Sequence, residues 1–122
     1  MSRQQLPTAI QDRIDAIAAD NTHGALELTT QAADTLQLLA EKSRTESAEQ
    51  ISEQIAAAGK ALVHAQPMMA PLVHLTNAVM LAVEGATELE QMQRRLQQSC
   101  ELFLKRLREN RQSVATIAAG LI

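Results

Sequence analysis

The sequence has almost no aromatic residues: Phe103 is the only one among 122, and there is no tryptophan or tyrosine. Aliphatic residues are abundant instead, because 46% of the chain is apolar. A core must therefore be built from Ala, Leu, Ile, Val and Met, a palette that favours helices over strands. The length is that of one domain, so we expect residues 1–122 to form a single helical domain.

Cysteine and long apolar runs are also scarce. Cys100 is the only cysteine, which excludes an intramolecular disulfide. The first residues, MSRQQLPTAIQDR, lack the apolar run of a signal peptide, and no run of about eighteen apolar residues occurs anywhere. We therefore expect a soluble, cytoplasmic protein without a membrane partner.

Charge of one sign does not dominate the chain. The net charge is −3 and gives no general drive toward nucleic acid or membrane. Residues 1–90 carry 5 basic and 12 acidic side chains, whereas residues 91–122 carry 6 basic and 2 acidic ones. The basic run KRLRENR, Lys105 to Arg111, is interrupted by Glu109, and no aromatic side chain for base stacking lies near it except Phe103. We interpret it as a solvated helix face and expect no nucleic-acid partner.

Apolar residues spaced by three and four positions predict helices along the whole chain. A first helix is expected near Pro7, with an inner face of Leu6, Ile10, Ile14 and Ile17. The second is expected to have Thr22 as its N-cap and an inner face of Ala25, Leu28, Ala32, Leu36 and Leu39. No segment shows the alternation of a strand, so the predicted class is all-α.

Three further helices are predicted after residue 46. Ser47 and Gln50 form a capping-box pattern that begins the third helix, and Gly59 within it indicates close packing on a neighbour. Pro67 and Pro71 break the chain before a fourth helix, LVHLTNAVMLAV, which is apolar on nearly every face and is predicted to be the most buried. A fifth, from Glu88 to about residue 119, spans roughly 50 Å. The predicted architecture is a bundle of about five helices with a long C-terminal one.

Residues suited to catalysis are few. Cys100 lies in the apolar repeat of the last helix, which indicates a core thiol. The histidines, His23, His64 and His74, lack the spacing of metal ligands. We expect no catalytic residue, no metal and no cofactor in this chain, and do not expect it to be an enzyme by itself.

The turn at His23 and Gly24 has two interpretations. It is either a tight connection between two helices or a cradle for an anion, since free amides at a helix N-terminus attract negative charge and glycine lets a ligand approach closely. The residues alone leave both open.

Three segments together suggest a family. HGALELTTQAADTLQLLAEKS, GKALVHAQPMMAPLVHLTNAV and a long helix ending in RENRQSVATIAAGLI resemble the N-terminal helical domain of the initiation factor 2B alpha/beta/delta family. That family includes ribose 1,5-bisphosphate isomerases and methylthioribose 1-phosphate isomerases. The resemblance extends from about residue 10 to the end.

The resemblance implies a set of ligand-binding residues. The isomerases have Arg-Gly-Ala at the start of the second helix, where the arginine and nearby amides hold a substrate phosphate; the matching residues are His23, Gly24 and Ala25. A second feature, Arg-Pro followed by an asparagine, corresponds to Gln66-Pro67 and Asn77. A phosphorylated small molecule is the implied ligand. Both arginines are replaced, which weakens the isomerase interpretation because histidine and glutamine lack the guanidinium fork.

In the family a Rossmann-like α/β domain follows the helical one and carries the catalytic cysteine and aspartate, and this sequence stops at about the point where it would begin. We therefore expect a non-catalytic regulatory or interaction domain of an initiation factor 2B-like protein. The N-terminal part of a ribose 1,5-bisphosphate isomerase-type enzyme is the alternative, and a generic adaptor bundle a third. The implied partners are that α/β domain and further copies of the chain, with Val114, Ile117 and Leu121 as the predicted interface.

Overall fold

The computed structural model describes residues 6–42 and 47–120, and the side chains of residues 6–41 and 47–110. The described residues form five helices and no strand, which confirms the all-α prediction. The helices are α1 (Thr8–Ala19), α2 (Ala25–Lys42), α3 (Ala48–Ala65), α4 (Ala70–Val83) and α5 (Leu89–Gly120).

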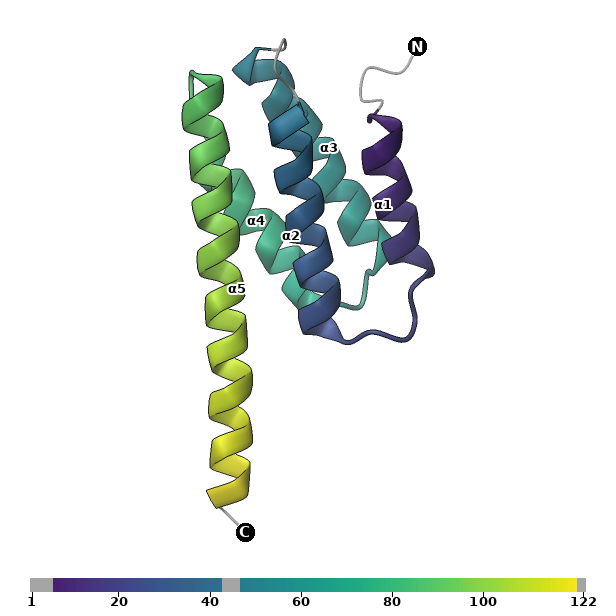
Figure 1. Ribbon diagram of the computed structural model, residues 1–122, viewed down its shortest axis with the longest axis vertical. Coiled ribbons are helices and arrows are strands. Elements are labelled where there is room, and N and C mark those ends of the chain that lie inside the picture. The colour runs from purple at the N-terminus through teal and green to yellow at the C-terminus, as the bar shows by residue number, and fades with distance from the viewer. Residues whose placement is uncertain (1–5, 43–46, 121–122) are drawn as a thin grey trace.

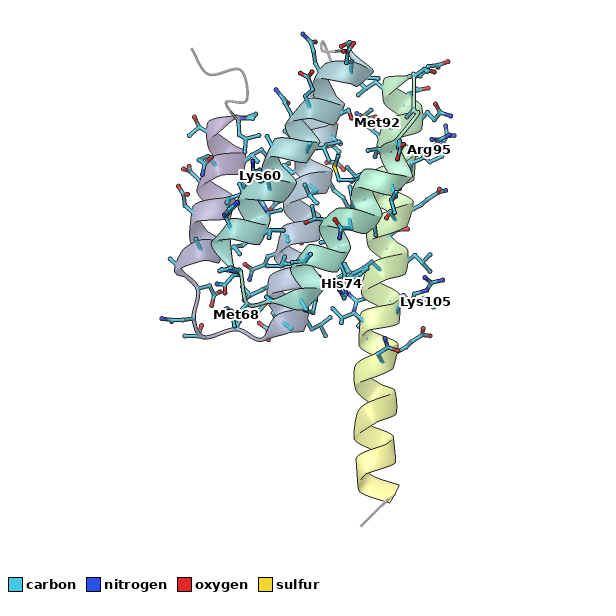
Figure 2. The ribbon with its side chains drawn as sticks, turned by 180° about the vertical axis from the view of Figure 1, so that it is seen from behind. Lys60, Met68, His74, Met92, Arg95 and Lys105 are labelled. Atoms are coloured by element: carbon cyan, nitrogen blue, oxygen red, sulfur yellow. The ribbon has the colours of Figure 1, made fainter. Side chains whose placement is uncertain are left out.

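Helix α2 is the centre of the bundle: it packs against each of the other four helices, as α3 also does, and it buries more residues than any other described helix. Figure 1 shows α1 and α5 on its two sides, with α3 and α4 behind it. Figure 2, from the opposite side, shows α3 and α4 as the near layer. None of the described helices is both long and apolar enough to cross a membrane.

The core is aliphatic, as the composition predicts, and α2 supplies the largest share of it. The fully enclosed residues of α2 are Leu28, Thr29, Ala32, Ala33, Thr35, Leu36, Leu39 and Ala40. The prediction that the fourth helix is the most buried was wrong. Helix α4 buries Leu72, Leu75, Val79 and Val83, whereas Leu81 on its outer face is 72% exposed. When a helix is apolar on nearly every face, its sequence does not indicate which face is buried. Helix α4 lies in an outer layer of the bundle.

The helix ends follow local rules in most places. Ser47 Oγ accepts a hydrogen bond from the Gln50 amide at 3.1 Å, and Gln50 Oε1 accepts one from the Ser47 amide at 3.0 Å, so the predicted capping box is present. Pro71 occupies the first turn of α4, where its missing N–H costs nothing. The predicted N-cap of α2 was wrong: Gly24 O accepts the first helical bond, from Leu28, and Thr22 belongs to the preceding turn.

The C-terminal part of helix α5 extends beyond the bundle. Among the described side chains of α5, which end at residue 110, the last buried one is Leu104, and Lys105, Arg106 and Arg108 are all exposed. The sixteen residues from Lys105 to Gly120 correspond to about 24 Å of helix. Figure 1 shows this part of α5 running past the ends of the other helices, and we call residues 105–120 the α5 extension.

Thr29 places a polar atom in the core without a partner. Its side chain is fully buried, and no hydrogen bond reaches Oγ1 from the described residues. Because an unpaired buried hydroxyl carries a desolvation penalty, replacing Thr29 with valine of similar shape is expected to raise the free energy of unfolding by about 1 kcal/mol. Urea unfolding followed by circular dichroism measures this change.

Thr35 provides the matched control on the same helix. It is equally buried, but its Oγ1 donates to Gln31 O at 2.7 Å. Thr35→Val therefore removes a satisfied hydroxyl and is expected to leave the stability unchanged or lower it by up to about 1 kcal/mol. If Thr29→Val destabilises the protein as much as Thr35→Val does, the Thr29 hydroxyl is not an unpaired buried group.

Candidate functional site

The turn between α1 and α2 is organised by the carboxylate of Asp20, the C-cap residue of α1. Asp20 Oδ1 accepts hydrogen bonds from the amides of Thr22 and His23, both at 3.0 Å, and from the Thr22 hydroxyl at 3.2 Å. Aspartate commonly bonds to amides two and three residues ahead in this way. The amides of Thr22 and His23 are therefore already occupied by an internal anion.

His23 lies between two carboxylates. Its Nδ1 is 2.6 Å from Asp20 Oδ2, and its Nε2 is 3.2 Å from Glu27 Oε2 in the first turn of α2. The hydrogen bond with Asp20, and then the charges of Asp20 and Glu27, raise the pKa of His23 above its usual value. In turn, the hydrogen bond from the His23 ring, followed by the two amide bonds, holds the pKa of Asp20 well below its usual range.

Gln66 ties the loop between α3 and α4 to the same turn. Its Nε2 donates to Ile17 O at 2.8 Å and to Asp20 O at 2.9 Å, so one amide group satisfies two backbone carbonyls at the end of α1. Buried or half-buried carbonyls at a helix end need such partners. The loop after α3 is thereby fixed beside the α1–α2 turn.

Gly24 and Ala25 complete this part of the site. Gly24 is exposed, and a β-carbon added there would meet nothing within 4 Å, so neither packing nor backbone conformation requires glycine at this position. Ala25 is the first residue of α2. The backbone at Gly24 is therefore open to solvent on the side of the added β-carbon.

The structure brings four of the five predicted ligand-binding residues to one end of the bundle: His23, Gly24, Ala25 and Gln66. Asn77 is separate. It is exposed on α4, seven residues beyond Ala70, or about 10 Å along that helix. Within the described residues no hydrogen bond joins it to the turn. The ligand-binding role of all five stays a prediction.

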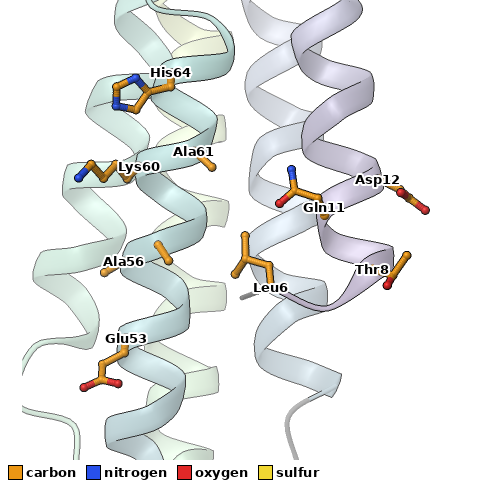
Figure 3. A pocket seen from close by; sticks show the side chains of 10 residues that line it. Leu6, Thr8, Gln11, Asp12, Glu53, Ala56, Lys60, Ala61 and His64 are labelled. Carbon is orange, nitrogen blue, oxygen red and sulfur yellow. The ribbon is translucent and has the colours of Figure 1, made fainter. Parts of the chain in front are cut away.

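A groove that the sequence did not reveal lies between α1 and α3. Its volume is about 880 Å³, and its lining residues are Leu6, Thr8, Gln11, Asp12, Glu53, Ala56, Ala57, Lys60, Ala61 and His64. Figure 3 shows Leu6 and Gln11 directed toward the alanines of α3. None of the predicted ligand-binding residues lines it. The only sequence signal was the run of small residues around Ala56, whose short side chains leave this space unfilled.

The other candidate chemical groups are placed apart from the turn. Cys100 is completely buried, and loss of hydration, followed by the charge of Asp34, raises the pKa of Cys100 to about 12. It is the core thiol that the sequence predicted. In the described part of the chain, no three His, Cys, Asp or Glu side chains gather as metal ligands would. The predicted interface of Val114, Ile117 and Leu121 lies outside the described side chains.

These features define a helical domain with a polar junction of Asp20, His23 and Gln66 where α1, α2 and the loop after α3 meet. The family model described as the Initiation factor 2 subunit family, IF-2B, matches residues 21–122. The chain therefore belongs to the IF-2B family, and it corresponds to that family's N-terminal helical domain. A comparison with curated proteins finds none that matches the chain.

Proposed function

We propose that this chain is a non-catalytic regulatory or interaction domain of an initiation factor 2B-like protein, and that the α5 extension is the element through which it binds. The proposal rests on the observation that α5 continues about 24 Å past Leu104, the last buried residue among its described side chains. Most helical stability in proteins comes from tertiary packing, and the extension has little of it at its described side chains, residues 105–110. A second surface packed on it would supply that stability.

The chemistry of the described residues supports a binding role. Cys100 is enclosed and has a raised pKa, so it is a protonated thiol at neutral pH and a poor nucleophile. The ring of His23 is engaged by two carboxylates on both nitrogens, which leaves no free nitrogen to act on a substrate in this arrangement.

The partner that family membership suggests for the α5 extension is the α/β domain of the same protein. For the chain alone we expect the extension to pair with that of a second copy. Sedimentation velocity over a range of concentrations is expected to give a mass above the 13.3 kDa of one chain. Leu107, half-buried just beyond Leu104, would contribute an apolar contact, so Leu107→Glu is expected to weaken the association.

Lys105→Glu is the control for charge, because Lys105 is exposed on the same helix, as Figure 2 shows, and contributes no apolar face. It is expected to leave the association largely intact. A wild-type chain that sediments as 13.3 kDa at every concentration would refute pairing through the extension.

A sugar-phosphate pocket, as in the isomerase-type alternative, is favoured by one observation. His23 and Gln66 lie 43 positions apart in the sequence, yet both contact Asp20, at positions where the isomerases carry phosphate-binding arginines. Titration with ribose 1,5-bisphosphate and with nucleoside monophosphates, followed by amide shifts from His23 to Ala25, tests it. A phosphate bound at the start of α2 would lie close to the Asp20 carboxylate, so shifts at millimolar ligand are expected to spread to Thr22, whose amide donates to Asp20. No shift at that concentration would refute the pocket in this chain.

A further inference from the structure

The side chains of Asp20, His23 and Glu27 form a three-membered ionic cluster, which we call the His23 clasp. It joins the C-cap of α1 to the first turn of α2 across the imidazole ring. The two contacts differ in strength and setting. Asp20 is 2.6 Å from Nδ1 and its side chain is only 13% exposed, whereas Glu27 is 3.2 Å from Nε2 and is 62% exposed.

We propose that the His23 clasp is a proton-operated switch: a protonated ring holds both carboxylates, and loss of the proton releases Glu27 while Asp20 stays bound. This goes beyond the function proposed for the α5 extension and concerns the turn between α1 and α2, which Figure 1 shows at the end of the bundle that the extension runs past.

The asymmetry follows from the donors of histidine. An imidazolium ring donates from both nitrogens, so it satisfies Asp20 and Glu27 together. A neutral ring has one N–H, and that hydrogen stays on Nδ1 because the Asp20 carboxylate lies closer, is less exposed and is fixed by three further hydrogen bonds. The bare Nε2 then faces a carboxylate oxygen at 3.2 Å with no hydrogen between them. Glu27, which is mostly exposed, is free to turn into water.

The charge state of the His23 ring depends mainly on these two carboxylates. Asp20 comes from the end of α1 and Glu27 from α2, and these are the two charged groups of the described chain that raise the pKa of His23. The loop between α3 and α4 contributes Gln66, an uncharged side chain that bonds to Asp20 O. The pKa of His23 is raised, first by its hydrogen bond with Asp20 and then by the two charges.

The direction of the pH dependence follows from that raised pKa. The clasp is fully closed below the ordinary histidine value of 6.5 and opens as the pH rises through the higher value of the folded protein. Asp20 stays ionised throughout, since its own pKa is lowered. Opening frees Nε2 and the first turn of α2 beside Gly24.

Nuclear magnetic resonance of the whole chain with labelled histidine and glutamate tests the switch. Above the midpoint we expect Nδ1 to carry the proton and Nε2 to give the signal of an unprotonated nitrogen, the reverse of the tautomer that free histidine prefers. The Glu27 carboxyl carbon is expected to shift with the same midpoint as the ring. Glu27→Gln, at an exposed position, is expected to move the His23 midpoint to lower pH.

Glu90→Gln is the matched control, because Glu90 is an exposed acidic residue in the first turn of α5. It is expected to leave the His23 midpoint unchanged. The switch is overturned if neutral His23 carries its proton on Nε2, or if Glu27→Gln and Glu90→Gln give the same midpoint as the wild type.

Discussion

Replacing Leu36 with alanine is expected to lower the free energy of unfolding by about 2–5 kcal/mol, the largest loss among the variants considered. Leu36 is completely buried on α2, the central helix, which packs against all four others. Removing three of its carbons would leave a cavity lined by an aliphatic core. With only one aromatic residue in the chain, no large ring is at hand to fill that space. Urea unfolding monitored by circular dichroism gives the difference.

Leu102→Ala is the control for the same chemical change in a different setting. Leu102 is 48% exposed on α5, so its truncation opens no cavity and is expected to change the stability by about 0.5 kcal/mol or less. Equal effects at Leu36 and Leu102 would show that α2 is not the centre of the core.

Local features of the fold were predictable because they depend on neighbours in the sequence. Ser47 and Gln50 are three residues apart, and each satisfies the other's backbone amide without help from the rest of the chain. Pro67 likewise lies between α3 and α4, and Pro71 lies in the first turn of α4, where the backbone restrictions of proline are tolerated. Both assignments came from the residue types and their spacing alone.

Packing between helices was harder to predict, because it depends on which faces meet. The apolar sequence of α4 indicated the deepest position, yet Leu81 is exposed and α2 occupies the centre. The apolar residues of α2 cover only part of its circumference. Its buried face is wider than that, because it also includes two polar residues, Thr29 and Thr35. The burial of these two threonines could not be predicted from the spacing of apolar residues.

The candidate site was predicted in part. Family resemblance pointed to His23 and Gln66, and the fold brings these two together although 43 positions separate them. Asp20 was missed, since the sequence shows only an aspartate three residues before a histidine at the end of a helix. That spacing is the available signal, because an aspartate there reaches both the ring and the amides that follow.

Histidine in place of arginine at position 23 makes the charge of the turn depend on pH. An arginine at position 23 would stay positively charged at any physiological pH, whereas His23 loses its charge as the pH rises through its raised pKa. With Asp20 and Glu27 on either side, the turn becomes more negative as His23 loses its proton. Any anion that binds at this turn is therefore expected to bind more weakly as the pH rises.

Replacing Gly59 with alanine is expected to lower the free energy of unfolding, although alanine is the better helix former. Gly59 is buried where α3 meets α4, and a β-carbon there would lie 2.5 Å from Thr76 Cγ2. Thr76 resists rotation because its Oγ1 donates to Leu72 O at 2.9 Å. Overpacking costs about 1–3 kcal/mol, and the gain in helix propensity is about 1 kcal/mol, so a net loss of about 1 kcal/mol is expected.

The reason for that loss is tested by a double-mutant cycle with Thr76→Ser. Serine keeps the hydroxyl that bonds to Leu72 O and removes the methyl group that blocks the new β-carbon. In this background Gly59→Ala is expected to raise the stability by up to about 1 kcal/mol, so the sign of the effect reverses and the coupling is about 2 kcal/mol. If Gly59→Ala destabilises both backgrounds equally, the loss arises from the α3 backbone and not from contact with Thr76. The close approach of α3 and α4 would then owe nothing to this pair.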